Sequence, residues 1–202
     1  MSRVELLDPL VANQIAAGEV VERPASIVKE LLENSLDAGA NQIGVEIVEG
    51  GAKSILVRDD GLGIHKDDIE LAMSRHATSK IKSADDLFDI DGFGFRGEAL
   101  ASIASVSRFS ISSKTADSDI GWELVSEGGQ VVSFKPRSQT IGTRVLVEDL
   151  FFNTPVRQKF LKAERTENRQ IEGVLLRLSL ANLGVGFALK GTTAKEKLLV
   201  PN

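Results

Sequence analysis

The 202-residue sequence contains no cysteine, so disulfide bonds and thiolate metal sites are excluded. Only His65 and His76 could supply imidazole ligands, which argues against a zinc site. No apolar run approaches the roughly 18 residues of a membrane span, and the first residues lack the charged, apolar and cleavage regions of a signal peptide. These absences favour a soluble, cytoplasmic protein with no membrane partner.

The chain also lacks an excess of positive charge. It has 24 Lys and Arg against 29 Asp and Glu, a formal net charge of -5. The chain as a whole is therefore not a basic nucleic-acid binder, although a local basic patch remains open. With 42% apolar residues the chain can bury a real core, and its length favours one large domain over residues 1–202.

Hydrophobic periodicity and turn residues predict the order of the elements. Helices are expected at 13–22, 24–37, 66–74, 98–105, 156–161 and 164–181. Strands are expected at 42–48, 54–59, 107–114, 120–126, 130–135, 143–148, 185–190 and 196–200, with a hairpin turn at 49–51. Residues 75–97 have little periodicity, and an irregular segment of that length is typical of a lid or binding loop. The pattern favours an α+β fold, a two-layer sandwich of helices and a mixed, mostly antiparallel sheet.

The second predicted helix carries Glu30, Asn34 and Asp37 at spacings of four and three residues. At roughly 100° per residue these side chains fall within about 60°, while the apolar positions point largely the other way. Lys29 and Glu33 are expected on a third, solvated side. Two carboxylates and one amide without a cation suit a hard cation and a water that needs a base. An ordinary polar helix face is the alternative.

Residues 92–97 match the pattern G-x-G-x-x-G, but residues 84–91 before them carry four aspartates. A buried strand is required there, so the match does not indicate a dinucleotide fold. Glycines still let backbone N–H groups approach a phosphate, and Gly97 opens a helix whose N-terminus favours anions. A flexible surface loop is the alternative. The chain has no P-loop pattern.

Asp59 stands at the end of a predicted strand and is followed by Gly61 and Gly63. A carboxylate beside glycines that admit a flat ring could accept a hydrogen bond from an exocyclic amine, such as the N6 group of adenine. Gly142 and Thr143 precede another strand and could back the same ring. An ordinary acidic turn is the alternative.

These segments occur in the order of the four motifs of the GHKL ATPases, the superfamily of gyrase B, histidine kinases, heat-shock chaperones and MutL. The sequence most closely resembles the MutL mismatch-repair family. The blocks that carry the resemblance are residues 13–25, 29–39, 75–80, 94–100 and 153–155. They are long and specific, and the resemblance covers nearly the whole chain, which implies the GHKL (Bergerat) fold.

The resemblance implies a role for each motif. Glu30 would be the general base that activates the attacking water, and Asn34 would bind the Mg²⁺ that bridges the phosphates. Asp59 would hold the adenine amine, while Asp37 and His76 are expected to serve structure and lid packing. The base site would be lined by Gly61, Gly63 and Thr143. The lid over the phosphates would comprise Thr78, Ser79, Lys80, Gly94, Phe95, Arg96, Gly97, Glu98, Ala99 and Leu100.

The resemblance also implies a function: a switch domain of mismatch repair that binds ATP with Mg²⁺ and hydrolyses it slowly. ATP would order the lid and the N-terminal segment, which then dimerise with a second copy. The dimer would couple a mismatch-recognition protein of the MutS type to a downstream nuclease or helicase, in the cytoplasm and at the bacterial nucleoid. A module that binds nucleotide or a partner with negligible hydrolysis is the alternative. A histidine-type kinase is disfavoured because the MutL-specific blocks would have no purpose in it.

Three departures from the family pattern bear on these expectations. Asp60 stands where the family commonly has asparagine, and its charge could perturb the Mg²⁺ or the adenine pocket. Phe152 stands where the family often has tyrosine, which removes a hydroxyl. In the family a second, ribosomal-protein-like domain supplies a lysine to the terminal phosphate, and a C-terminal domain dimerises. Neither is among the 202 residues, so we expect this chain to bind ATP, turn it over poorly and remain mainly monomeric.

One segment of this acidic chain is locally basic. Against Glu164 and Glu167, it holds Arg157, Lys159, Lys162, Arg165 and Arg169. These side chains form a candidate surface for DNA phosphates, and the family resemblance favours weak DNA binding without sequence preference. A solvated helix face is the alternative. The aromatic residues Phe151, Phe152 and Phe160 are expected in the core rather than in base stacking.

Overall fold

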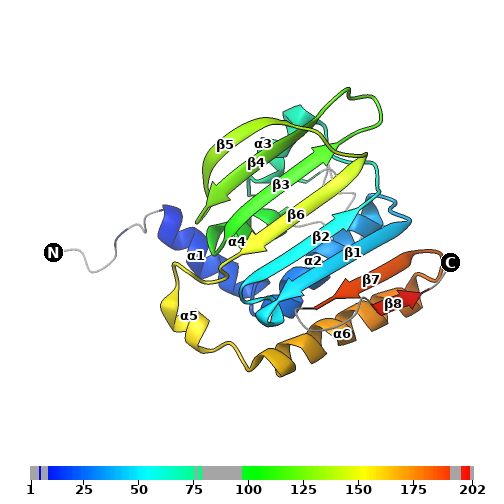
Figure 1. The fold of residues 1–202 in the computed structure, drawn as a ribbon. Coiled ribbons are helices and arrows are strands. Elements are labelled where there is room, and N and C mark those ends of the chain that lie inside the picture. The colour runs from blue at the N-terminus through cyan, green and yellow to red at the C-terminus, as the bar shows by residue number, and fades with distance from the viewer. Residues whose placement is uncertain (1–4, 6–8, 76, 79–96, 192–196, 201–202) are drawn as a thin grey trace, which may run out of the picture.

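The computed structural model describes residues 5, 9–75, 77–78, 97–191 and 197–200 (Figure 1). Within this part of the chain, the strands form one sheet. They are β1 (Gln42–Val48), β2 (Ser54–Asp59), β3 (Arg108–Lys114), β4 (Gly121–Glu127), β5 (Gln130–Arg137), β6 (Gly142–Glu148), β7 (Gly186–Lys190) and β8 (Lys197–Val200). The helices are α1 (Pro9–Val20), α2 (Pro24–Asp37), α3 (Lys66–Ala72), α4 (Ala99–Ser105), α5 (Pro155–Lys159) and α6 (Glu164–Ala181).

The sheet has the order β5-β4-β3-β6-β2-β1-β7-β8. Every neighbouring pair is antiparallel except β1 and β7, which run parallel. Parallel neighbours need a crossover, and the chain makes it through α6 before β7 (Figure 1). The predicted α+β fold with a mixed, mostly antiparallel sheet is therefore confirmed.

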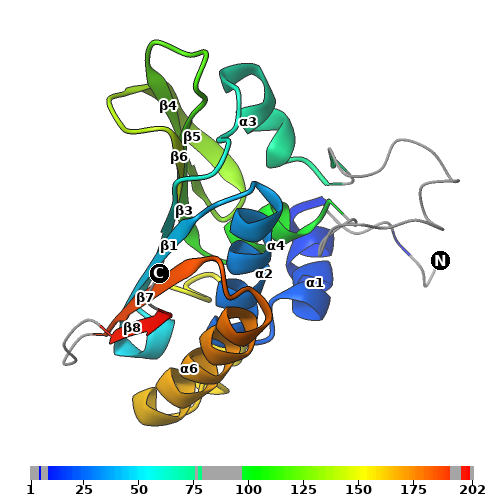
Figure 2. The same ribbon diagram turned by 90° about the vertical axis from the view of Figure 1, so that its right-hand side faces the viewer.

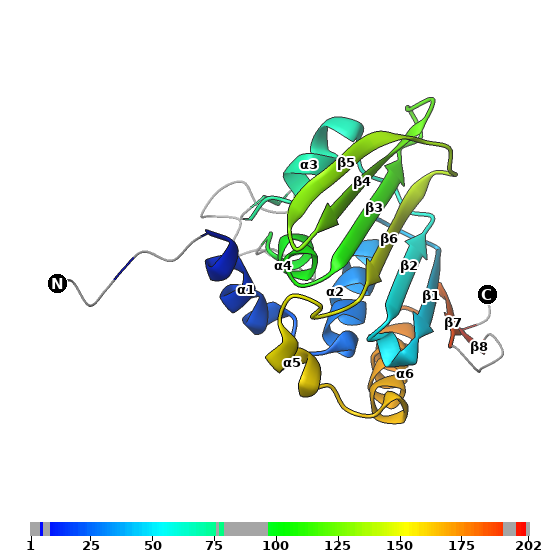
Figure 3. The same ribbon diagram turned by 60° about the vertical axis from the view of Figure 1, so that its left-hand side comes forward.

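The helices cover one face of the sheet and leave the other face open (Figures 2 and 3). Alternate strand residues point into the helix layer, as the period of two requires. On the strands, the buried residues of this face include Ile43, Val45, Ile47, Ile55, Val57, Phe109, Ile111, Val145 and Val147. From α2 they meet Ile27, Val28, Leu31 and Leu32. The core thus fixes α2, with its polar stripe, in a defined rotation over the middle of the sheet.

The predicted bounds of α2, β1 and β2 agree with the structure, whereas the predicted start of α1 does not. Helix α1 begins at Pro9 rather than at residue 13, because proline is well tolerated at a first helical position. Residues 49–51 form a short 3₁₀ turn, η1 (Glu49–Gly51). Strands β1 and β2 pair antiparallel on either side of it, with Val48 opposite Ser54, so the predicted hairpin is confirmed.

An ion pair joins the start of α2 to α6. Arg23, the residue before α2, donates from Nε and Nη2 to the Glu167 carboxylate at 3.2 and 3.1 Å. Glu167 is only 2% exposed and also accepts a hydrogen bond from the Lys162 amide at 3.0 Å. The bond to Glu167 raises the pKa of Arg23 and outweighs the opposing effect of partial burial. Because a buried carboxylate needs such a partner, this pair ties the helix layer together.

The substitution Arg23→Gln should lower the free energy of unfolding by about 3 kcal/mol, since it leaves Glu167 buried without its cation. Urea unfolding followed by the fluorescence of Trp122, the single tryptophan, measures this. The double variant Arg23→Gln/Glu167→Gln should recover part of the loss because the buried charge is gone. Arg177→Gln, at an exposed position of α6, is the control and should change stability by less than about 0.5 kcal/mol. If the control lost as much stability as Arg23→Gln, the ion pair would not be what stabilises the helix layer.

Candidate nucleotide site

Asp59 ends β2 and is the centre of a hydrogen-bond cluster between the sheet and α2. Its Oδ2 accepts from the Ser35 hydroxyl of α2 at 2.9 Å. Its Oδ1 accepts from the backbone N–H groups of Gly61 at 3.0 Å and of Thr143 at 3.2 Å. Three elements therefore orient one carboxylate.

Burial raises the pKa of Asp59 above the usual range of an aspartate. The hydrogen bonds from Ser35, Gly61 and Thr143 oppose this effect, and the nearby charge of Asp60 adds to it. A half-buried carboxylate that is costly to keep charged, yet held by several elements, is typical of a functional site.

The backbone packs so closely around Asp59 that a side chain in place of the neighbouring glycine would clash. Gly142 has φ +114°, and a Cβ built on it would lie 2.1 Å from the Asp59 carbonyl oxygen. Thr143 follows, and its hydroxyl lies 2.9 Å from the Ser113 hydroxyl. On the other side, the segment that contains Gly61 and Gly63 is fixed by a hydrogen bond from the Leu62 amide to the Ala38 carbonyl at 2.9 Å. The predicted base-site residues thus come together.

Two serines complete this cluster that sequence reasoning did not single out as site residues. Ser35 lies on the apolar back of α2 and is 3% exposed. Ser113 of β3 accepts from the Ile64 amide at 2.7 Å and donates to the Gly142 carbonyl at 3.0 Å. A serine within an otherwise apolar helix face was a usable signal for Ser35. For Ser113 the sequence offers none, because only the sheet register brings it beside Thr143.

Asp60 does not enter the pocket as the sequence suggested it could. Its Oδ1 accepts from the amides of Asn41 and Gln42, both at 2.8 Å, and its side chain is exposed. The carboxylate therefore caps the start of β1. Its influence on the base site is limited to a like charge beside Asp59.

The stripe on α2 differs from the prediction in one respect, because a cation lies against it. Lys29 Nζ is 2.7 Å from Glu33 Oε2 and 3.5 Å from Glu30 Oε1. Glu33, predicted to be solvated, is only 7% exposed. Partial burial disfavours the Lys29 ammonium, but Glu33 and Glu30 together raise its pKa. Both predictions, a solvated Glu33 and a stripe without a cation, were wrong.

Only some of the predicted lid residues are among those that the structure describes. His76, Ser79, Lys80, Gly94, Phe95 and Arg96 lie outside the described residues, while Thr78 is described. Gly97 and Glu98 lead into α4, where Ala99 and Leu100 begin the helix. A Cβ on Gly97 would lie 2.5 Å from the Ala77 carbonyl oxygen. The two ends of the predicted lid therefore meet beside the first turn of α4.

The described residues fit a magnesium ion that is held mainly by phosphates. Among them, no group of three or more histidine, aspartate and glutamate side chains gathers at one place. Glu30 and Asn34 stand one helical turn apart on α2 and offer one carboxylate and one amide oxygen. Mg²⁺ commonly takes one or two protein oxygens and completes its shell with water and substrate phosphates.

The basic segment follows α5 into α6, and most of its cations face solvent. Lys159, Lys162, Arg165 and Arg169 are exposed. Arg157 instead turns inward, with its guanidinium 4.3 Å from the centre of the Phe151 ring and bonded to the Val21 carbonyl. Arg157 therefore serves the fold, and the candidate DNA surface is reduced to the other four residues.

The aromatic residues beside this segment also depart from expectation. Phe151 is buried, as predicted, but Phe152 is 36% and Phe160 is 72% exposed. Phe152 packs under the Arg108 guanidinium, 5.0 Å from the ring centre, so a surface cation covers it in place of a core.

Comparison with known proteins agrees with this geometry. Residues 22–139 match the model of the histidine kinase-, DNA gyrase B- and HSP90-like ATPases. The chain is 55% identical over 190 residues to the DNA mismatch repair protein MutL of Pseudomonas fluorescens, and 56% identical to that of Pseudomonas putida. Each match covers 94% of this chain but 30% of the relative, so the chain spans less than a third of the length of these relatives.

Solved structures show the same relationship. The MutL ATPase domain of Aquifex aeolicus complexed with ADP is 37% identical, with a TM-score of 0.75 over 91% of this chain and 65% of that one. The N-terminal domain of a DNA repair protein is 32% identical, with a TM-score of 0.73 over 93% of this chain and 54% of that one. The chain belongs to the family of histidine kinase-, DNA gyrase B- and HSP90-like ATPases, and its sequence corresponds to the N-terminal ATPase region of MutL.

Within the described residues, no helix has both the length and the apolar character that a membrane span requires.

The substitution Asp59→Asn should lower the affinity for ATP without lowering the stability of the fold. An amide nitrogen in place of Oδ2 can donate to Ser35, whose hydroxyl is then free to donate to the Leu31 carbonyl, 3.1 Å away. The same nitrogen would face the adenine N6 amine. Two donors would then meet, and the hydrogen bond to adenine would be lost. ATP affinity should fall about 10- to 100-fold, as for a lost hydrogen bond to a charged group, while the melting temperature at pH 7 stays equal or rises.

The sign of the pH dependence follows from the raised pKa of Asp59. The folded state holds this proton more tightly than the unfolded state, so the contribution to stability is complete below the unfolded pKa and is lost as the pH rises through the folded pKa. The advantage of Asp59→Asn should therefore shrink in acid. Calorimetry and thermal unfolding across pH measure both effects, with Asp60→Asn as the matched control that leaves ATP affinity within about twofold. Equal affinities for ATP and GTP would contradict the assignment.

Proposed function

We propose that this chain binds ATP with Mg²⁺ and hydrolyses it as the switch domain of a MutL-type mismatch-repair protein. The observation that carries the proposal is the 2.9 Å hydrogen bond between Ser35 and Asp59. It fixes α2, which carries Glu30 and Asn34, to the carboxylate suited to an adenine amine. The ADP complex of the related Aquifex aeolicus domain supports the choice of nucleotide.

In this proposal each end of the site has its own chemistry. Asp59 accepts the adenine N6 amine, while the glycines beside it and Thr143 pack against the ring. At the other end, Asn34 would offer an oxygen to a Mg²⁺ ion, which would supply positive charge beside the phosphates. Glu30 accepts a proton from the water that attacks the terminal phosphate. Lys29 lies between Glu30 and Glu33, and its bond to Glu33 is the shorter of the two.

Glu30→Ala should lower the hydrolysis rate about 10²- to 10⁴-fold and leave ATP affinity nearly unchanged, because a general base acts on the water and not on the bound nucleotide. A phosphate-release assay and calorimetry with a non-hydrolysable ATP analogue measure the two effects. Glu70→Ala, at an exposed glutamate of α3, is the control and should change neither. An equal loss of binding and turnover in Glu30→Ala would exclude this role.

The wider activity belongs to the same proposal. ATP binding would order the segment between residues 75 and 97 over the phosphates and favour association with a second copy through the N-terminal region. The domain would bind DNA weakly and communicate with a MutS-type protein and with a downstream nuclease or helicase, in the bacterial cytoplasm at the nucleoid. Similarity to the mismatch-repair relatives supports these steps.

Lys159→Glu combined with Lys162→Glu should weaken DNA binding, since the exposed cations of α5 and α6 form the proposed phosphate surface. The slope of log affinity against log salt should fall by about 0.9 for each DNA phosphate that the variant no longer neutralises, with ATP affinity unchanged. The charge-matched control is Lys135→Glu with Lys190→Glu on the open face of the sheet. If this control rather than the first variant flattens the slope, DNA binds the open sheet face.

A further inference from the structure

The open face of the sheet carries a row of residues that the nucleotide site does not use. The strand registers align this row from β7 to β5 as Ala188, Gly44, Arg58, Arg144, Ser112, Glu123 and Lys135. Two arginines therefore stand directly opposite each other on β2 and β6, with small residues on both sides. Like charges in directly opposed positions of neighbouring strands are destabilising.

Of the three neighbouring arginines in the described part of the chain, Arg144 alone makes no ion pair. Arg58 pairs with Glu46 at 2.6 Å, and Arg137 pairs with Glu123. Among the described residues, no carboxylate forms an ion pair or hydrogen bond with Arg144. The residue is half-buried. Burial, followed by the positive charges of Arg137 and Arg58, lowers its pKa, and the carboxylates of Glu148 and Glu46 oppose this effect.

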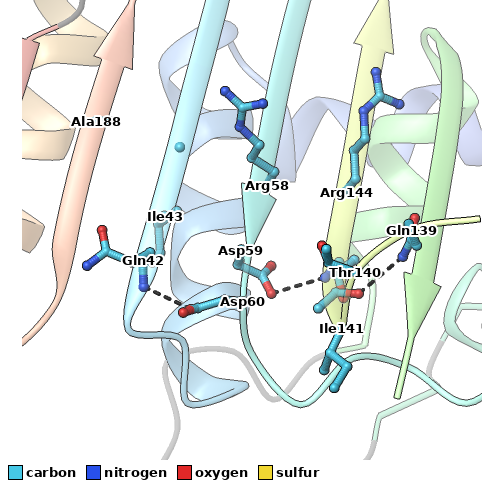
Figure 4. A pocket seen from close by; sticks show the side chains of 13 residues that line it. Gln42, Ile43, Arg58, Asp59, Asp60, Gln139, Thr140, Ile141, Arg144 and Ala188 are labelled. Atoms are coloured by element: carbon cyan, nitrogen blue, oxygen red, sulfur yellow. Dashed lines mark hydrogen bonds between the residues drawn. The ribbon is translucent and has the colours of Figure 1, made fainter. Parts of the chain in front are cut away.

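A cavity of about 380 Å³ opens beside this arginine. Its floor is formed by β1, β2 and β6 with the small Ala188 of β7, and the Arg58 side chain lies over Gly44. Arg58 and Arg144 extend in the same direction from neighbouring strands, away from Asp59 and Asp60 (Figure 4). The opposite rim is polar and is formed by Gln42, Asp60, Gln139 and Thr140.

We propose that Arg144 is the anchor of a second ligand site, which takes a small oxyanion: a carboxylate or phosphate group of a small molecule. A guanidinium presents a planar fork that binds such groups through two parallel hydrogen bonds. The cavity volume suits a small molecule rather than a protein surface. Asp60 lies at the rim, where its Oδ1 accepts hydrogen bonds from the Asn41 and Gln42 amides, and the anion would bind at the arginine side of the cavity.

The cavity is also lined by Asp59, Gly142 and Thr143, which belong to the nucleotide site, but its arginines lie on the opposite face of the sheet. Arg58 precedes Asp59 on β2, and Arg144 follows Thr143 on β6. Successive strand residues point to opposite faces, so the adenine residues face the helices while the arginines face the open side. An oxyanion at Arg144 would lie behind the base and could not be the phosphates of the same nucleotide.

The test is an NMR titration of the full 202-residue chain with inorganic phosphate and, separately, with acetate, at constant ionic strength and with ADP present at saturation. The amides of Gly44 and Arg144 and the Arg144 side-chain Nε–H should shift saturably. Arg144→Gln should abolish the saturable shifts, and Arg144→Lys should weaken binding several-fold. Whichever anion saturates at lower concentration identifies the preferred group.

The matched control is Arg177→Gln, which removes one exposed arginine from α6, a helix on the other side of the sheet. It should titrate like the original chain. A second readout guards against misfolding: the melting temperature of Arg144→Gln without phosphate should equal or exceed that of the original chain, since an opposed like charge is removed. Shifts that persist in Arg144→Gln, shifts abolished equally in Arg177→Gln, or no saturable shift with either anion would overturn the proposal.

Discussion

The carboxylate of Asp59 is the group on which the arrangement of the site depends. It accepts hydrogen bonds from α2, from the turn after β2 and from the start of β6. Its burial is costly, because desolvation raises its pKa, and the fold offsets this by supplying three donors. Of these bonds, the one from Ser35 joins α2 to the site and adds to the core packing that sets the rotation of the helix. The geometry of Glu30 and Asn34 relative to the base site is therefore a consequence of how one acid is kept charged.

The residues that sequence predicted well are those whose roles are local. Helix α2 and strands β1 and β2 were placed correctly because apolar periodicity, Pro24 and the glycine turns act within a few residues. Glu33 was misplaced because its burial depends on tertiary packing, which the periodicity of a single helix does not describe. The link between Lys29 and Glu30 was missed because a flexible side chain can bridge two helix faces. Ser113 was missed because only the sheet register brings it to Thr143.

Charged side chains lie on both sides of the sheet, but they are paired differently on the two sides. On the helix side, Asp59 and Glu33 are surrounded by donors or a cation. On the open side, Arg58 and Arg137 have acidic partners, whereas Arg144 has none among the described residues. Arg144 thus differs from the other two arginines in having no ion-pair partner in the described part of the chain, and an external anion would supply one.

The parallel pairing of β1 with β7 has a consequence for how the chain folds during synthesis. The residues of β1 leave the ribosome long before residues 186–190, so one edge of β1 must wait for most of the chain to be made. Closing so long a loop is slow, and an unpaired strand edge invites association with other chains. Helix α6 lies directly before β7 and packs against α2. When α6 docks on α2, it therefore brings β7 next to the unpaired edge of β1.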